Sequence, residues 1–286
     1  MKNAKILLLI FIAPVIIGVL LLTWLFDLPD VLMDMPDVYS TWGKTPAWRL
    51  ALAVDTQNTA WITHVAKAHP DVLNYREPTD GYTVLIWAVG HEKYRSARAL
   101  LHCGANPNIR DKMGETALYV AAGYSWVDDD AKKDPKYVKL LLRHGADPNI
   151  PYIGFGHNGN SYDAKEAGTT PLMHSIPCGL EKTKALVEGG ADLNQKTVNG
   201  TTAAVVALTF GALNVTDAGR EYAYYLIAVK KAKVTDPYNS VDLLTDPPKV
   251  FYPVDDLKDW NPEVGTKGYW MKMQIINEFR RQGVKY

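Results

Sequence analysis

Residues 101–108 of this 286-residue chain read LHCGANPN, and residues 142–149 repeat the pattern as LRHGADPN. A looser third copy, VEGGADLN, occupies residues 187–194. A second motif, Gly-x-Thr, recurs alongside the first, at residues 81–83, 114–116, 168–170 and 200–202. Two motifs that recur together indicate a stack of similar units rather than one globular core. Such a stack usually presents a binding surface rather than a catalytic pocket.

The recurring residues have the properties that a pair of short helices requires. A threonine hydroxyl at the start of a helix accepts a hydrogen bond from a backbone N–H that has no partner within the helix. A glycine after a helix adopts the left-handed conformation that ends it. The threonines expected to begin helices are Thr83, Thr116, Thr170 and Thr202, and the glycines expected to end them are Gly104, Gly145 and Gly190.

These units resemble ankyrin repeats, whose pattern runs D-x-x-G-x-T-P-L-H-x-A-A and then L-L-x-x-G-A-D-x-N. The clearest copy begins at residue 80 as DGYTVLIWAV and continues as ALL at 99–101 and GAN at 104–106. The resemblance implies an all-α repeat solenoid with short β-hairpin fingers, in five units at 44–77, 78–110, 111–150, 151–195 and 196–235. The histidine of the family pattern is replaced in every unit, by Trp48, Ile86, Tyr119, Met173 and Val205.

The N-terminal segment reads as a membrane anchor. Ile6 through Phe26 is an apolar run long enough to cross about 30 Å of hydrocarbon. Lysines precede the run and aspartates follow it, which places the N-terminus in the cytoplasm. A cleaved signal peptide is the alternative, but its apolar part is normally only about 7–15 residues long. We predict a signal anchor at 1–26, a spacer at 27–43, the ankyrin-repeat domain at 44–236 and a C-terminal cap at 237–286.

The C-terminal cap is expected to contain a helix from Tyr269 onward. Its apolar stripe is predicted to be Trp270, Met273, Ile276 and Phe279, at helical spacing. The stripe suits a helix that buries the exposed end of the stack, and a helix lying on a membrane surface is the alternative.

The candidate binding residues lie where an ankyrin stack has its concave face. The hairpin between Asn149 and Gly168 is much longer than the one before it, and its inserted stretch alternates glycines with aromatic residues. Aromatic side chains are common interface anchors, although these could also pack back onto neighbouring fingers. The residues predicted to contact a partner are Tyr152, Phe155, His157, Asn158 and Tyr162 in this finger, with Tyr82, His91, Tyr124, His174 and Phe210 elsewhere on the face.

Several other function classes are not indicated. Lys+Arg and Asp+Glu balance at 31 each, which argues against nucleic-acid binding. The two cysteines, Cys103 and Cys178, are predicted to be free thiols, and no metal-ligand spacing is present. Residues 154–159 match G-x-G-x-x-G but lack the flanking strand and helix of a dinucleotide site. We predict no catalytic residues, no metal and no cofactor.

The combined features predict a non-enzymatic protein-binding module in a bacterial inner membrane, crossing it once, with its repeats in the periplasm. The specific hypothesis is an immunity or inhibitor protein that binds a secreted antibacterial effector such as a lipase. The alternative is a periplasmic scaffold that supports an envelope or stress-defence enzyme. An enzyme and a structural anchor for an envelope complex are further possibilities.

Overall fold

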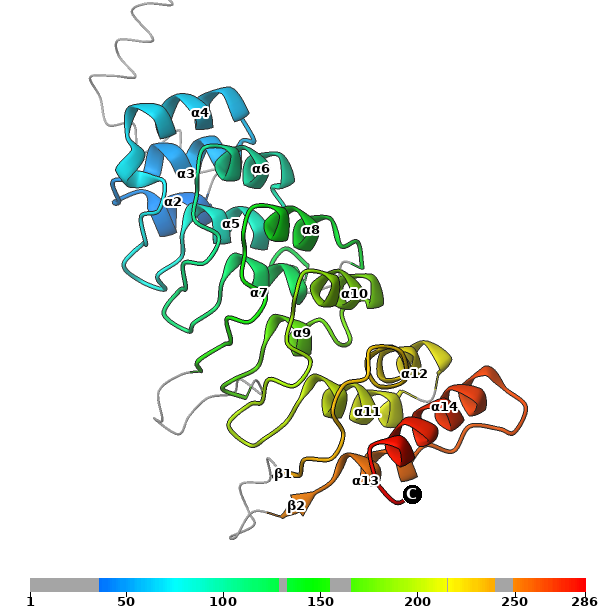
Figure 1. Ribbon diagram of the computed structural model, residues 1–286. Helices are drawn as coiled ribbons and strands as arrows, with labels where there is room; N and C mark the ends of the chain where they lie inside the picture. The colour runs from blue at the N-terminus through cyan, green and yellow to red at the C-terminus, as the bar shows by residue number, and fades with distance from the viewer. Residues whose placement is uncertain (1–35, 129–132, 155–165, 215, 240–248) are drawn as a thin grey trace, which may run out of the picture.

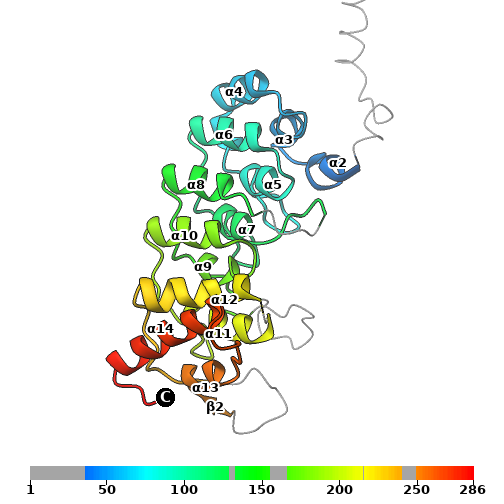
Figure 2. The ribbon, with the colours of Figure 1, turned by 90° about the vertical axis from the view of Figure 1, so that its right-hand side faces the viewer.

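The computed structural model describes residues 36–128, 133–154, 166–214, 216–239 and 249–286. Short helices stack along one direction in two layers, and the hairpin loops project to one side (Figures 1 and 2). The helices are α2 (Pro36–Trp42), α3 (Trp48–Asp55), α4 (Thr59–Ala68), η2 (Pro70–Val72), α5 (Val84–Gly90), α6 (Tyr94–His102), α7 (Ala117–Ala122), α8 (Lys136–Arg143), α9 (Pro171–His174), α10 (Leu180–Glu188), α11 (Ala203–Leu213), α12 (Asp217–Ala223), η3 (Tyr224–Val229), α13 (Pro253–Lys258) and α14 (Lys267–Arg281). Strands β1 (Tyr238–Asn239) and β2 (Val250–Phe251) form an antiparallel pair.

The helices form inner and outer pairs. The inner layer consists of α3, α5, α7, α9 and α11, and the outer layer of α4, α6, α8, α10 and α12 (Figure 2). Leucines between successive pairs are fully buried, among them Leu100 in α6 and Leu141 in α8. The predicted helical-repeat architecture is therefore confirmed.

The predicted helix signals are also confirmed. The hydroxyl of Thr83 accepts from the backbone N of Ile86 at 3.2 Å, and Thr116, Thr170 and Thr202 do the same at the starts of α7, α9 and α11. Gly104, Gly145 and Gly190 have φ values of +92°, +81° and +91°. A Cβ at any of the three would meet no atom within 4 Å, so the positive φ alone favours glycine there.

Side-chain amides link each unit to the next. Asn108 Oδ1 accepts from the backbone N of Asp147 at 2.8 Å, while its Nδ2 donates to the carbonyl of Gly145 at 2.9 Å. Asn149 repeats both bonds one unit later, to Asp192 N at 2.7 Å and Gly190 O at 3.2 Å. The asparagine that ends the motif therefore makes the same bonds to the following unit in both places.

Backbone hydrogen bonds also join the finger tips. Lys112 N donates to Asp80 O at 2.8 Å, and Ile153 N donates to Met113 O at 3.1 Å. The series continues to β1, where Asn239 N donates to Asn199 O at 2.8 Å. The segment that follows the last repeat motif is thereby attached to the row of fingers.

The start of the folded region differs from the prediction. Residues 27–43 were expected to be a spacer, yet α2 packs against α3 and buries Trp42 completely. The Trp42 ring meets Trp87 of α5 edge to face, with 6.3 Å between ring centroids. The predicted membrane segment at 6–26 lies outside the described residues. Within the described part of the chain, no helix has the length and apolar character needed to cross a membrane.

At the other end, α13 packs on α11, and α14 packs on α12 and η3 (Figure 1). The predicted stripe on α14 is partly wrong. Ile276 and Phe279 are buried as expected, but Trp270 is 49% exposed, and Met271 and Ile275 occupy the core. The helix is rotated about its axis relative to the prediction, since its buried face also carries Glu278, which is 3% exposed.

Candidate partner-binding surface

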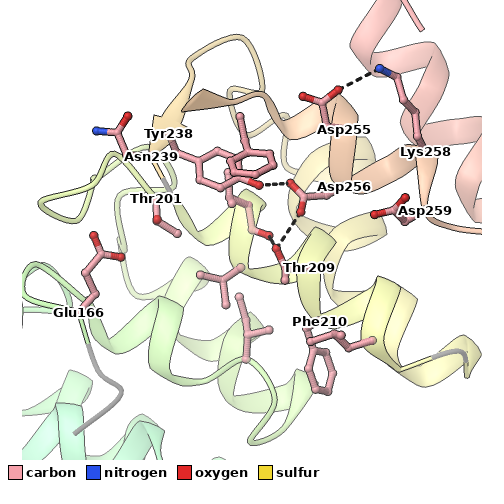
Figure 3. Close-up of a pocket in the computed structure, with 15 residues that line it drawn as sticks. Glu166, Thr201, Thr209, Phe210, Tyr238, Asn239, Asp255, Asp256, Lys258 and Asp259 are labelled. Carbon is pink, nitrogen blue, oxygen red and sulfur yellow. Dashed lines mark hydrogen bonds and ion pairs between the residues drawn. The ribbon is translucent and has the colours of Figure 1, made fainter. Parts of the chain in front are cut away.

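A groove lies on the inner-helix side of the stack, between α11 and the segment formed by β1, β2 and α13 (Figure 3). Its volume is about 750 Å³. Val206, Phe210 and Leu213 line it from α11, and the rings of Tyr238 and Phe251 form the opposite wall. Those two rings stack at a centroid distance of 5.9 Å, because β1 and β2 place Tyr238 and Phe251 in register.

Carboxylates surround the apolar part of this groove. Asp255, Asp256 and Asp259 come from or directly follow α13, and Glu166 comes from the finger beside it. Asp256 is fixed in place: Oδ2 accepts from the Tyr238 hydroxyl at 2.6 Å and Oδ1 from the Thr209 hydroxyl at 3.1 Å (Figure 3). These two bonds join α13 to β1 and to α11.

Burial dominates the titration of this pair. It raises the pKa of Asp256 above its ordinary value, although the hydrogen bonds from Tyr238 and Thr209 oppose the shift. The pKa of Tyr238 is also raised, first by burial and then by the hydrogen bond to Asp256. Asp255 behaves differently: the ammonium of Lys258, at 2.9 Å, lowers its pKa. Asp255 is therefore ionised at neutral pH.

Phe210 is the predicted residue that the structure brings to this groove. Its ring also meets Tyr222 edge to face, with 5.6 Å between centroids. The rest of the wall was not predicted, because residues 238–259 belong to no repeat motif. In the sequence, the run PVDDLKD at 253–259 could have indicated this wall of the groove, since it combines a helix start with closely spaced carboxylates.

Tyr82 and His91 lie together on the inner side of α5, but the segment after α7 covers them. The ring of Trp126 lies 5.0 Å from Tyr82 and 5.6 Å from His91, centroid to centroid. Trp126 N also donates to Gly90 O at 3.1 Å. Burial, with help from nearby carboxylates, raises the pKa of Tyr82 to about 12. Both side chains remain partly exposed, so their contact with a partner stays a prediction.

His174 and Tyr152 both pack against Tyr119. The His174 ring stacks on Tyr119 at 4.4 Å, and Tyr152 stacks on it at 5.8 Å. Tyr152 is 1% exposed, so the prediction that it contacts a partner is wrong. Tyr152 packs back into the stack, where its large ring is buried against Tyr119.

Tyr124 is 46% exposed and remains accessible. Phe155, His157, Asn158 and Tyr162 lie outside the described residues.

The described residues also contain a buried polar cluster behind the inner helices. Lys182 is 3% exposed, and its Nζ donates to the carbonyl of Gly123 at 2.9 Å. Burial lowers its pKa. Within the described residues, Cys103 and Cys178 form no disulfide, as predicted. Across the described part of the chain, no group of three or more His, Cys, Asp or Glu residues is arranged to hold a metal ion.

Comparison with known proteins gives a consistent result. Residues 50–152 match the family model described as ankyrin repeats in three copies. The chain is 40% identical over 69 residues to a protein of Treponema pallidum described as ankyrin repeat-containing, covering 24% of this chain and 20% of that protein. It is 28% identical over 141 residues to the human ankyrin repeat and SOCS box protein 6, covering 47% and 29% respectively.

A further relative is Protein PhlB of Serratia liquefaciens, 32% identical over 133 residues, or 46% of this chain and 48% of that protein. The chain spans between 20% and 48% of the length of these three relatives. What the comparisons share with the structure is the repeat itself: the matched residues contain the capped inner helices and the left-handed glycines described above. Residues 50–152 are therefore ankyrin repeats, stacked helix pairs of a kind that serves as a protein–protein interaction module.

Proposed function

We propose that this chain binds another protein through its inner-helix face, with the groove beside α11 as the main contact. The observation that carries the proposal is the apolar lining of that groove, together with an exposed Leu213 at its edge, 79% accessible. Exposed apolar surface at a concave site is typical of interfaces. Repeat stacks use this curved face for recognition.

Two groove variants test the proposal once a partner has been captured with the full chain. Leu213→Ser removes an exposed side chain and leaves the buried core intact, whereas Phe210→Ala shortens one wall. Each is expected to weaken binding about tenfold or more, the effect of losing an interface anchor worth roughly 1–2 kcal/mol. Lys139→Ser, on the exposed side of α8, is the matched control. Unchanged affinity in both groove variants would place the binding site elsewhere.

We also propose that residues 1–26 anchor the chain in a bacterial inner membrane, with the repeats in the periplasm. Support comes from the apolar run Ile6 through Phe26 and from the charges on either side of it. The full chain is then expected to stay with membranes after alkaline washing, and added protease is expected to reach the repeats in spheroplasts. Recovery in the wash, or protection of the repeats from protease, would contradict this topology.

Within this setting, we propose an immunity or inhibitor role against a secreted antibacterial effector, such as a lipase. A membrane tether concentrates the inhibitor where a membrane-attacking enzyme acts. The test is titration of a captured hydrolase with the chain: an inhibitor abolishes activity at a one-to-one ratio. Full activity in the complex would instead favour the second candidate, a scaffold that supports an envelope or stress-defence enzyme.

A further inference from the structure

The groove beside α11 has an apolar interior of useful size. Its volume, about 750 Å³, is several times the roughly 150 Å³ that holds a benzene ring. Phe210 and Leu213 line one side, and the stacked rings of Tyr238 and Phe251 line the other. One or more large apolar side chains therefore fit between the two walls.

The edge of the same groove is acidic. Among the described residues, its carboxylates are Glu166, Asp255, Asp256 and Asp259. The ammonium of Lys258 is bound to Asp255 at 2.9 Å, and that of Lys249 lies over the Phe251 ring at 4.7 Å. Asp256 is half-buried and accepts hydrogen bonds from Tyr238 and Thr209, so the three other carboxylates face two ammonium groups at this edge. Asp259 is exposed and has no ion-pair partner in the described part of the chain.

We infer that this groove is the docking site for a segment of a partner protein that presents an apolar side chain flanked by lysine or arginine. The inference rests on the proposed function and adds the chemistry of the partner. An apolar side chain enters between Phe210 and Phe251, while the flanking cations approach Asp259 and Glu166. Opposite charges across an interface increase the association rate and exclude wrongly charged partners.

The acidic edge also makes other occupants unfavourable. An acidic segment would bring like charges within a few ångströms of Asp259 and Asp255. The surface of an anionic bilayer would be repelled for the same reason. A second copy of this chain would have to present a basic apolar segment of its own, and self-association in analytical ultracentrifugation would reveal it.

Three short probes distinguish these possibilities, each acetylated, amidated and labelled at one end: Gly-Lys-Phe-Lys-Gly, Gly-Glu-Phe-Glu-Gly and Gly-Lys-Ser-Lys-Gly. Fluorescence anisotropy measures their binding to the full chain in neutral detergent micelles at low salt. The Lys-Phe-Lys probe is expected to bind at least about tenfold more tightly than either of the others. Its advantage over the Glu-Phe-Glu probe is expected to shrink as salt rises, because salt screens exposed charges.

A charge-neutralised chain, Asp255→Asn with Asp259→Asn, locates the effect. Its affinity for the Lys-Phe-Lys probe is expected to fall about fivefold, since each exposed pair contributes modestly. The matched control is Glu181→Gln with Glu188→Gln on the outer helix α10, which is expected to change nothing. Equal affinity for the Lys-Phe-Lys and Glu-Phe-Glu probes, self-association through this face, or no binding of any probe would overturn the inference.

The captured protein partner separates this inference from the proposed function. If Leu213→Ser loses the captured partner while the charge-neutralised chain keeps it, the groove binds protein. In that case the inferred lysine or arginine residues of the partner segment are wrong. Retention in both chains means that the groove is not the binding site, so both proposals fall. Loss in both chains supports both.

Discussion

At the residue scale, the asparagine that ends a repeat motif links its unit to the next unit through its side chain. Asn149 bonds to the backbone of residues 190 and 192, and Asn108 bonds to residues 145 and 147. An asparagine amide has both a donor and an acceptor, so it satisfies two backbone groups of the next unit at once. Aspartate at the same position would supply the acceptor alone.

Asn149→Ala is expected to destabilise the chain by about 1–3 kcal/mol, because two backbone groups lose their partners. Urea unfolding followed by circular dichroism measures the change. Asn261→Ala is the control, since the Asn261 amide donates only to the carbonyl of Asp259, two residues away. Indistinguishable midpoints for Asn149→Ala and the control would show that the linking amides contribute little.

Lys231 stands where earlier units have glycine, and it adopts the same left-handed conformation, with φ of +64°. Its ammonium binds Glu278 at 2.9 Å. Replacement by glycine or by alanine removes this pair equally. Lys231→Gly is therefore expected to be more stable than Lys231→Ala by about 1–2 kcal/mol, the energy that a Cβ costs in this conformation. Thermal unfolding of the two variants measures the difference, and equal stability would mean that the loop relaxes to another conformation.

At the element scale, α14 is held to the last helix pair by a buried carboxylate. Glu278 accepts from Lys231, from Arg281 at 2.5 Å and from Gln282 at 2.9 Å. Gln282 also donates to Ala232 O at 3.0 Å, so α14 is attached to the loop that ends η3. The hydrogen bond from Arg281, opposed by burial, lowers the pKa of Glu278 to about 2.

A lowered pKa stabilises the fold at neutral pH, and the stabilisation disappears as the carboxylate becomes protonated. The free energy of unfolding of the wild type is expected to exceed that of Glu278→Gln by about 1–3 kcal/mol at pH 7. This difference in unfolding free energy is expected to shrink as the pH falls from 4.5, the ordinary pKa of a glutamate, towards 2, the pKa of Glu278 in the fold. Urea titrations at several pH values measure it, with the exposed Glu263→Gln as control. A gap that stays constant with pH would exclude the charge of Glu278 as its cause.

At the scale of the whole molecule, the main contacts of each described helix pair are with its neighbours. Helix α8 packs on α6, α7 and α10, whereas α14 packs on α12 and η3. In such an array, stability is approximately a sum of unit and nearest-neighbour terms. Damage in one unit should therefore affect nearby units more than distant ones.

Leu141→Ala, at a fully buried site in α8, is expected to lower the free energy of unfolding by about 2–5 kcal/mol. Amide hydrogen exchange should then lose most protection in α6, α8 and α10, and least in α14. Leu226→Ala in η3, also fully buried, should give the opposite distribution. Uniform loss of protection along the chain in both variants would contradict nearest-neighbour coupling.

The repeat motifs alone determined the stack, its helix caps and its left-handed glycines, because these are local properties of a few residues. Thr83 caps the helix that directly follows it, and the positive φ of Gly145 favours glycine although no atom lies within 4 Å of where a Cβ would stand. The resemblance to ankyrin repeats also placed Phe210 on the concave face, at a position that varies within the family.

Only the tertiary structure decided which of these side chains are available to a partner. Tyr152 became buried because Tyr119 lies beside it, and Trp126 covers Tyr82 and His91 from a segment more than 30 residues further along the chain. The groove required β1, β2 and α13 to return beside α11, where Asp256 of α13 accepts hydrogen bonds from Thr209 of α11 and from Tyr238 of β1. Contacts between distant parts of a chain depend on packing, and no local pattern encodes them.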